Sequence, residues 1–190
     1  MHDIIRIAFE CVWGLTVLVW LVGIFISKRT ARRTSLSSRL LLLAPILIGY
    51  VLVASHAIRY GWINQRLWSH SLSIQAVGLA LTIVGCGFAI WARITLGANW
   101  SGRPTVKEGH ELIVRGPYAL VRHPIYSGLL LALAGSALAV DRGGCILGWA
   151  LVAATYVVKI RQEELLMMQT FPDSYLQYTE RVRAFIPGIF

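Results

Sequence analysis

Five long runs of uncharged, mainly apolar residues constrain this 190-residue chain more than any other feature of its sequence. A bilayer-spanning helix needs about 20 such residues; the second and third runs reach that length, and the first can extend at its N-terminal end. Only Asp141 and Arg142 separate the fourth run from the fifth, which predicts a tight helical hairpin with this polar pair at its tip. The runs cover residues 11–27, 40–58, 71–92, 124–140 and 143–158.

The composition favours a membrane protein over a soluble helical bundle. Hydrophobic residues make up 56% of the chain and charged residues 14%, whereas a soluble domain carries about 25% charged residues. Five such runs would leave a soluble bundle too few polar faces. We therefore expect an all-α integral membrane protein with five transmembrane helices and a cytoplasmic C-terminal helical segment. The three cysteines lie inside apolar runs without a C-x-x-C pair, so we expect neither a disulfide nor a metal site.

The placement of the basic residues predicts how the chain crosses the membrane. Thirteen of the eighteen Lys and Arg residues lie in residues 28–39, 97–123 and 159–190. By the positive-inside rule these segments are cytoplasmic, so the N-terminus lies outside and the C-terminus inside, as an odd number of spans requires. Because these residues do not gather on one amphipathic surface, the net charge of +9 is expected to reflect topology, not nucleic-acid binding.

The stretch RGPYALVRHPIYSG, residues 115–128, places polar side chains at the mouth of the fourth apolar run. Pro124 suits the first position of a helix, so the positive end of that helix would face the cytoplasm. Arg122 and His123 beside it would complete an anion site, and Tyr118 and Tyr126 offer faces to a planar base or a cation.

Membrane-interface anchoring explains each of these residues taken singly, since aromatic belts and interfacial cations are common. The turn expected at Gly116 and Pro117 favours a binding site instead, because it would fold the preceding loop back against the helix start. Both interpretations stay open at this point.

The stretch RQEE, residues 161–164, is the second candidate cluster. Two adjacent carboxylates are costly next to lipid unless they are paired or wet, and Arg161 and Glu164 are spaced to share a helix face. A solvated helix exit with a weak surface ion pair explains the pattern equally well. No residue up to Thr170 breaks a helix. After Pro172 we expect a further helix, capped by Asp173 or Ser174, with Tyr175 and Tyr178 on one face.

Taken together, GPYALVRHPIYSG and the downstream IRQEELLMMQTFPDSYLQYTERVRAFIP resemble the isoprenylcysteine carboxyl methyltransferases and the related phospholipid N-methyltransferases. These are integral-membrane enzymes that use S-adenosyl-L-methionine. WARITLGANWSG, residues 91–102, is also similar to that family. The resemblance implies a single membrane methyltransferase domain over residues 1–190, with N-terminal spans in residues 1–84 and the catalytic core in residues 85–190. One departure is Phe171-Pro172, where the family usually has Phe-Gly.

The resemblance also implies roles for individual residues and no metal. The helix start with Arg122 would hold the carboxylate of the cofactor, two tyrosines its cation or ring, and the backbone of residues 112–116 its adenine edge. The implied catalytic residues are Arg161, Glu163 and Glu164. The implied cofactor-binding residues are Leu112, Val114, Gly116, Pro117, Tyr118, Arg122, His123, Pro124, Tyr126, Tyr175 and Tyr178.

The methyl acceptor is the least constrained part of this expectation. A carboxylate acceptor needs no base, and Arg161 could orient it; an amine acceptor would need Glu163 or Glu164 to take a proton. Both stay open, and the carboxylate of an isoprenylcysteine-like substrate is favoured.

Two alternative interpretations of the whole chain remain open. An NADPH-dependent sterol-type reductase shares a His-Pro-x-Tyr segment, and a non-catalytic adaptor would use the tail for docking. The expected partners are the lipid bilayer and a lipophilic or lipidated substrate. Compactness favours a bacterial inner membrane over endoplasmic reticulum, and the oligomeric state is open.

Overall fold

The described part of the protein is helical throughout. The computed structural model describes residues 2–26, 36–54, 61–68, 71–100 and 111–185. Within them lie six α-helices and three short 3-10 helices, and the described residues contain no β-strand beyond an isolated bridge between Val121 and Arg183. The α-helices are α1 (His2–Ile26), α2 (Leu36–Ala54), α3 (Leu72–Leu96), α4 (Pro124–Val140), α5 (Gly143–Thr170) and α6 (Pro172–Arg181); the 3-10 helices are η1 (Gly61–Asn64), η2 (Gly97–Asn99) and η3 (Gly116–Ala119).

Three of these helices are long and apolar enough to cross a membrane. They comprise Asp3–Ile26, Leu72–Asn99 and Gly143–Thr170, and two shorter apolar helices cover Leu41–Ala54 and Pro124–Val140. Large apolar side chains such as Phe25 and Leu41 are 90% and 75% exposed, which water would penalise and lipid would not. The protein is therefore an integral membrane protein. Much of the basic segment 28–39 lies outside the described residues.

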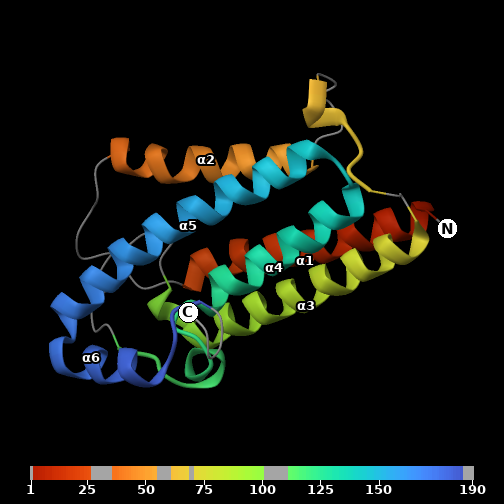
Figure 1. Ribbon diagram of the computed structural model, residues 1–190. Coiled ribbons are helices and arrows are strands. Elements are labelled where there is room, and N and C mark those ends of the chain that lie inside the picture. The colour runs from red at the N-terminus through yellow and green to blue at the C-terminus, as the bar shows by residue number, and fades with distance from the viewer. Residues whose placement is uncertain (1, 27–35, 55–60, 69–70, 101–110, 186–190) are drawn as a thin grey trace.

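Small residues let α3 and α4 approach each other closely. A side chain at Gly85 would collide with the backbone of α4 at Gly128 and Ala132, and one at Gly135 would collide with Gly78. The hydroxyl of Thr82 donates across the same interface to the carbonyl of Ala132, at 3.1 Å. The close packing of the two helices fixes the start of α4 against the C-terminal half of α3 (Figure 1).

The predicted hairpin between the fourth and fifth helices is present. Asp141 ends α4 with a left-handed backbone (φ 60°), and its carboxylate accepts the backbone N–H groups of Leu67 and Trp68 at 2.9 and 2.8 Å. The carboxylate thereby ties the hairpin tip to the loop that precedes α3.

Beyond the other helices, α5 continues without a break to Thr170, as predicted, and α6 turns back beneath the ends of α3 and α4 (Figure 1). Pro124 and Pro172 occupy first-turn positions of α4 and α6. The capping prediction is wrong: Phe171 is the N-cap of α6, without a side-chain hydrogen bond, because Pro172 already supplies the fixed φ that starts a helix.

The segment after α6 runs beside the start of α4. Arg122 and His123 donate their backbone N–H groups to the carbonyls of Arg183 and Ala184, at 2.8 and 3.0 Å. The hydroxyl of Ser127 donates to the carbonyl of Phe185 at 2.6 Å. These bonds hold α6 and the chain that follows it against the motif RHPIYSG.

Candidate active site

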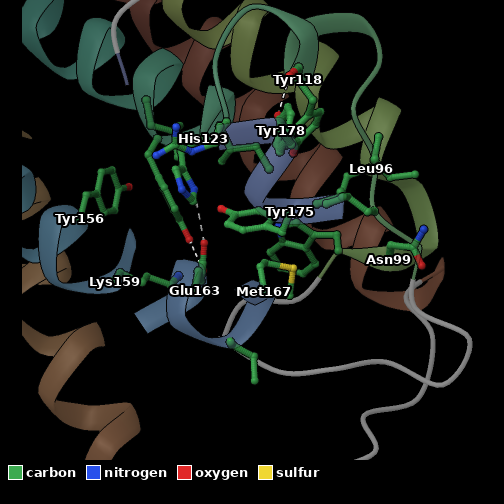
Figure 2. A pocket seen from close by; sticks show the side chains of 18 of the residues that line it. Leu96, Asn99, Tyr118, His123, Tyr156, Lys159, Glu163, Met167, Tyr175 and Tyr178 are labelled. Carbon is green, nitrogen blue, oxygen red and sulfur yellow. Dashed lines mark hydrogen bonds and ion pairs between the residues drawn. The ribbon is translucent and has the colours of Figure 1, made fainter. Parts of the chain in front are cut away.

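A cavity of about 420 Å³ lies where the start of α4, the middle of α5 and α6 meet (Figure 2). Its polar lining includes His123, Glu163 and the tyrosines of α6. Helices α1, α2 and α4 contribute apolar side chains to the same cavity. The apolar wall includes Trp20, Leu43, Ile46, Ile125 and Leu129.

Arg122 and Glu164 form the most strongly bonded pair of the site. The guanidinium donates to Glu164 Oε1 from Nε at 2.9 Å and from Nη2 at 2.6 Å. Its Nη1 donates to the carbonyl of Val182 at 2.6 Å. Because the two side chains are only 12% and 19% exposed, solvent screens the pair far less than it would a surface ion pair. The pair ties α4, α5 and the segment after α6 together.

His123 lies between the two adjacent carboxylates of α5. Its Nε2 is 3.3 Å from Glu164 Oε1, and its Nδ1 is 3.7 Å from Glu163 Oε2. Tyr126 donates its hydroxyl to Glu163 Oε1 at 2.6 Å, and its ring stacks with that of His123 at 5.9 Å between centroids. Both carboxylates therefore already hold hydrogen-bond donors from α4.

Tyrosines of η3 and α6 also line the cavity. Tyr178 donates its hydroxyl to the carbonyl of Tyr118 at 2.5 Å, and Tyr175 packs edge-on against Tyr178. Burial raises the pKa of all three phenols, and the charge of Glu163 adds to this effect at Tyr118. They are consequently neutral donors and aromatic faces at physiological pH.

Comparison with known proteins agrees with this architecture. Residues 77–169 match the model of the isoprenylcysteine carboxyl methyltransferase (ICMT) family. The match covers 93 of the 190 residues. A probable protein-S-isoprenylcysteine O-methyltransferase of Oryza sativa subsp. indica is 30% identical over 119 residues, 61% of this chain and 62% of that protein. Protein-S-isoprenylcysteine O-methyltransferase B of Arabidopsis thaliana is 28% identical over 130 residues, 67% of this chain and 64% of that protein.

A solved structure is similar in fold. It is the eukaryotic intramembrane Ras methyltransferase ICMT, with a TM-score of 0.53 and 21% identity, covering 84% of this chain and 55% of that one. The chain spans less than two thirds of the length of the curated relatives that it matches. The fold of the ICMT family thus extends over more of the chain than the family segment itself.

Most of the residues that the ICMT resemblance singled out come together in the structure. Eight of them line the cavity: Leu112, Tyr118, Arg122, His123, Tyr126, Glu163, Tyr175 and Tyr178. Three more are adjacent in sequence to lining residues: Gly116 has a positive φ of 61° that suits glycine, and Pro117 and Pro124 are buried at the starts of η3 and α4. Glu164 supports the site from behind through Arg122.

The last two of these residues, Arg161 and Val114, are exposed and do not line the cavity. Arg161 is exposed on α5, and Glu164 bonds to Arg122 instead of pairing with Arg161 as the three-residue spacing predicted. Val114 is 47% exposed. Neither Arg161 nor Val114 belongs to the described lining of the cavity. Arg122 is closer in space to Glu164 because tertiary contact between α4 and the extension of α5 overrides helix spacing.

Sequence reasoning missed several lining residues. On α5, Tyr156, Lys159 and Met167 share the face of Glu163, and their spacing of three and four residues was the signal that could have found them. Asn99 and Trp100 also line the cavity. They lie in the stretch WARITLGANWSG, for which no roles had been inferred.

Proposed function

We propose that this protein is an S-adenosylmethionine-dependent methyltransferase whose acceptor is the carboxylate of a lipophilic, isoprenylcysteine-like molecule. The main observation is a cavity lined by both polar and apolar side chains. The polar side chains can hold a water-soluble donor, and the apolar side chains of the membrane helices can hold a lipid tail. The match of residues 77–169 to the model of the ICMT family supports the same activity. The reaction centre would lie at the membrane interface.

The polar and aromatic residues of the cavity fit the chemical groups of S-adenosylmethionine. The faces of Tyr118 and Tyr175 would hold its cationic or aromatic parts, and the Asn99 side chain and the backbone at Leu112 would offer hydrogen bonds to its adenine. His123 would contribute a polar contact at the rim of α4. Arg122 would act indirectly, because its guanidinium already holds Glu164 and the Val182 carbonyl.

A carboxylate acceptor suits the hydrogen bonding of the site. When bound, S-adenosylmethionine would supply a sulfonium methyl group: the acceptor oxygen forms the new C–O bond while the S–C bond breaks and its electron pair stays on sulfur. No proton has to be accepted in that displacement. An amine acceptor would need a base, yet Glu163 holds the hydroxyl of Tyr126 and Glu164 holds Arg122. The chain would then contribute mainly by positioning the two reactants.

The proposed topology has five spans, with the N-terminus outside and the C-terminus in the cytoplasm. The lengths of α1, α3 and α5 and the apolar character of α2 and α4 support it. The basic segments 28–39, 97–123 and 159–190 would then share the side on which the cavity opens. Residues 1–84 would supply apolar side chains to the cavity, such as Trp20 and Ile46, and residues 85–190 the catalytic core.

Calorimetry with detergent-purified protein tests the donor directly. We expect saturable binding of S-adenosylmethionine, weakened about tenfold or more in His123→Ala, because the variant loses a buried polar contact at the cavity wall. Arg181→Met, an exposed change on α6, is the matched control and should bind as wild type. Binding of NADPH without S-adenosylmethionine would refute the proposal in favour of a reductase.

A further inference from the structure

Arg93 lies near the end of α3 and is buried inside the protein. It is only 3% exposed, whereas an arginine that only anchored the end of a span would extend its guanidinium to water. Its Nη1 donates to the carbonyl of Gly97 at 2.9 Å, and its Cζ lies 4.4 Å from the centroid of the Trp100 ring. Anchoring at the membrane surface therefore does not explain Arg93.

The partners of Arg93 belong to the turn that carries two lining residues of the cavity. Gly97 ends α3 and begins η2 with a positive φ of 53°, a conformation that suits glycine. Its carbonyl also accepts the backbone N–H of Trp100, at 3.3 Å. Asn99 and Trp100 both line the cavity. Arg93 thus holds the ring of Trp100 directly and the backbone turn through Gly97.

Helix α1 leaves room for the same guanidinium. Gly23 on α1 is buried, and a side chain at this position would collide with the guanidinium of Arg93. Among the described residues, Gly14 on the same helix has open space around it. Trp20, one turn before Gly23, lines the cavity, and α1 packs against both α3 and η2. Arg93 therefore joins α1 to the turn that carries Trp100.

We propose that Arg93 is a positioning residue for the methyl donor, which holds Trp100 and the turn at Gly97 in the arrangement that binds S-adenosylmethionine. This inference rests on the methyl transfer proposed above, in which Asn99 would offer a hydrogen bond to the adenine of the donor. An aromatic ring that is already fixed loses little conformational freedom when a ligand packs against it, so a fixed Trp100 increases the affinity for the donor. Arg93 does not belong to the described lining of the cavity and acts through the residues that do.

Donor binding by four single variants tests the proposal. Calorimetry with detergent-purified protein would measure the dissociation constant of S-adenosylmethionine for Arg93→Met, Arg93→Lys, Gly23→Ala and Gly14→Ala. We expect Arg93→Met to bind about tenfold more weakly, because it loses both contacts that fix Trp100. Arg93→Lys should keep part of the affinity, since its ammonium can still face the ring. Gly23→Ala should bind about threefold more weakly, because its methyl group displaces the guanidinium, whereas Gly14→Ala should bind as wild type.

A double variant shows whether Gly23 acts through Arg93. Adding Gly23→Ala to Arg93→Met should leave the dissociation constant of Arg93→Met unchanged, because the guanidinium that the methyl group would displace is gone. Kinetics gives a second readout. In Arg93→Met the KM for S-adenosylmethionine should rise about tenfold, while kcat and the KM for N-acetyl-S-farnesylcysteine stay within about twofold of wild type. A purely structural role of Arg93 would lower the fraction of protein that binds and leave the dissociation constant unchanged.

Each outcome supports or overturns the proposal. An unchanged dissociation constant in Arg93→Met overturns it, as does equal binding by Gly23→Ala and Gly14→Ala. A loss confined to N-acetyl-S-farnesylcysteine also overturns it, because the turn would then serve the acceptor. If Arg93→Met does not fold, Arg93→Lys and the two glycine variants decide by the same comparison. A wild-type protein that does not bind S-adenosylmethionine refutes the proposed function itself, independently of Arg93.

Discussion

Replacing Arg122 by methionine should destabilise the protein by about 3 kcal/mol. Truncating one partner of a buried ion pair typically costs about 3–5 kcal/mol, because the remaining charge is left without its partner. The lower end applies here, since His123 Nε2 stays 3.3 Å from Glu164 Oε1 and the Glu164 side chain is 19% exposed. The variant also leaves the carbonyl of Val182 without the donor that bonds it at 2.6 Å.

A double-mutant cycle separates the ion pair from these other losses. Charge-assisted hydrogen bonds contribute about 1.5–3 kcal/mol each, so Arg122→Met and Glu164→Met should be coupled by about 2 kcal/mol. The double variant should be less destabilised than the sum of the single variants, because it leaves no charge unpaired.

Unfolding in detergent, followed by tryptophan fluorescence against temperature and denaturant, measures the three variants against wild type. Arg181→Met, which removes an exposed charge from α6, should stay within about 0.5 kcal/mol of wild type. Strictly additive effects of the two single substitutions would refute the reasoning, because they would mean that Arg122 and Glu164 do not stabilise each other in the folded protein.

Three further predictions concern packing, pH and substrate length. Gly85→Leu should destabilise the protein by about 3 kcal/mol, because the new side chain would collide with the backbone of α4. Gly87→Leu, which has open space around it, should not destabilise the protein. Equal melting temperatures of the two variants would contradict this difference. Burial raises the pKa of Tyr175 and Tyr178 above the ordinary value. The unfolded chain therefore ionises first, and stability should fall as the pH rises above about 10, with a flatter profile in the double Tyr→Phe variant; an unchanged profile would exclude these phenols as the cause. Ile46→Trp should narrow the cavity where Ile46 lines it and so raise KM more for a farnesyl than for a geranyl acceptor. An equal change in KM for both acceptors would contradict binding of the lipid tail beside Ile46.

Local rules in the sequence predicted the helices well. Apolar runs and the prolines at first-turn positions act over one or two turns, so their consequences are visible without the fold. The cap of α6 was mispredicted because Asp173 and Ser174 are good capping residues on average, while Pro172 had already set the helix start at Phe171.

The candidate site depends on tertiary contacts that the spacing of residues along the sequence does not reveal. Arg161 and Glu164 are correctly spaced for a pair, but Arg122, 42 positions away, holds Glu164 instead. Lys159 was counted only as a topological charge because its burial depends on α2 and α4, which pack around it in the fold. The resemblance to the ICMT family supplied the motif residues, and the fold supplied the partners of those residues.

Identification of the reaction product tests the proposed methyl transfer to a carboxylate most directly. Purified protein in lipid vesicles would receive S-adenosylmethionine with a labelled methyl group and N-acetyl-S-farnesylcysteine, and mass spectrometry with alkaline hydrolysis would follow the label. We expect a base-labile methyl ester on the acceptor's carboxyl group and no label on the corresponding carboxamide. Protein that binds both reactants but forms no ester, or that transfers the label to the amine of phosphatidylethanolamine in the vesicles, would contradict it.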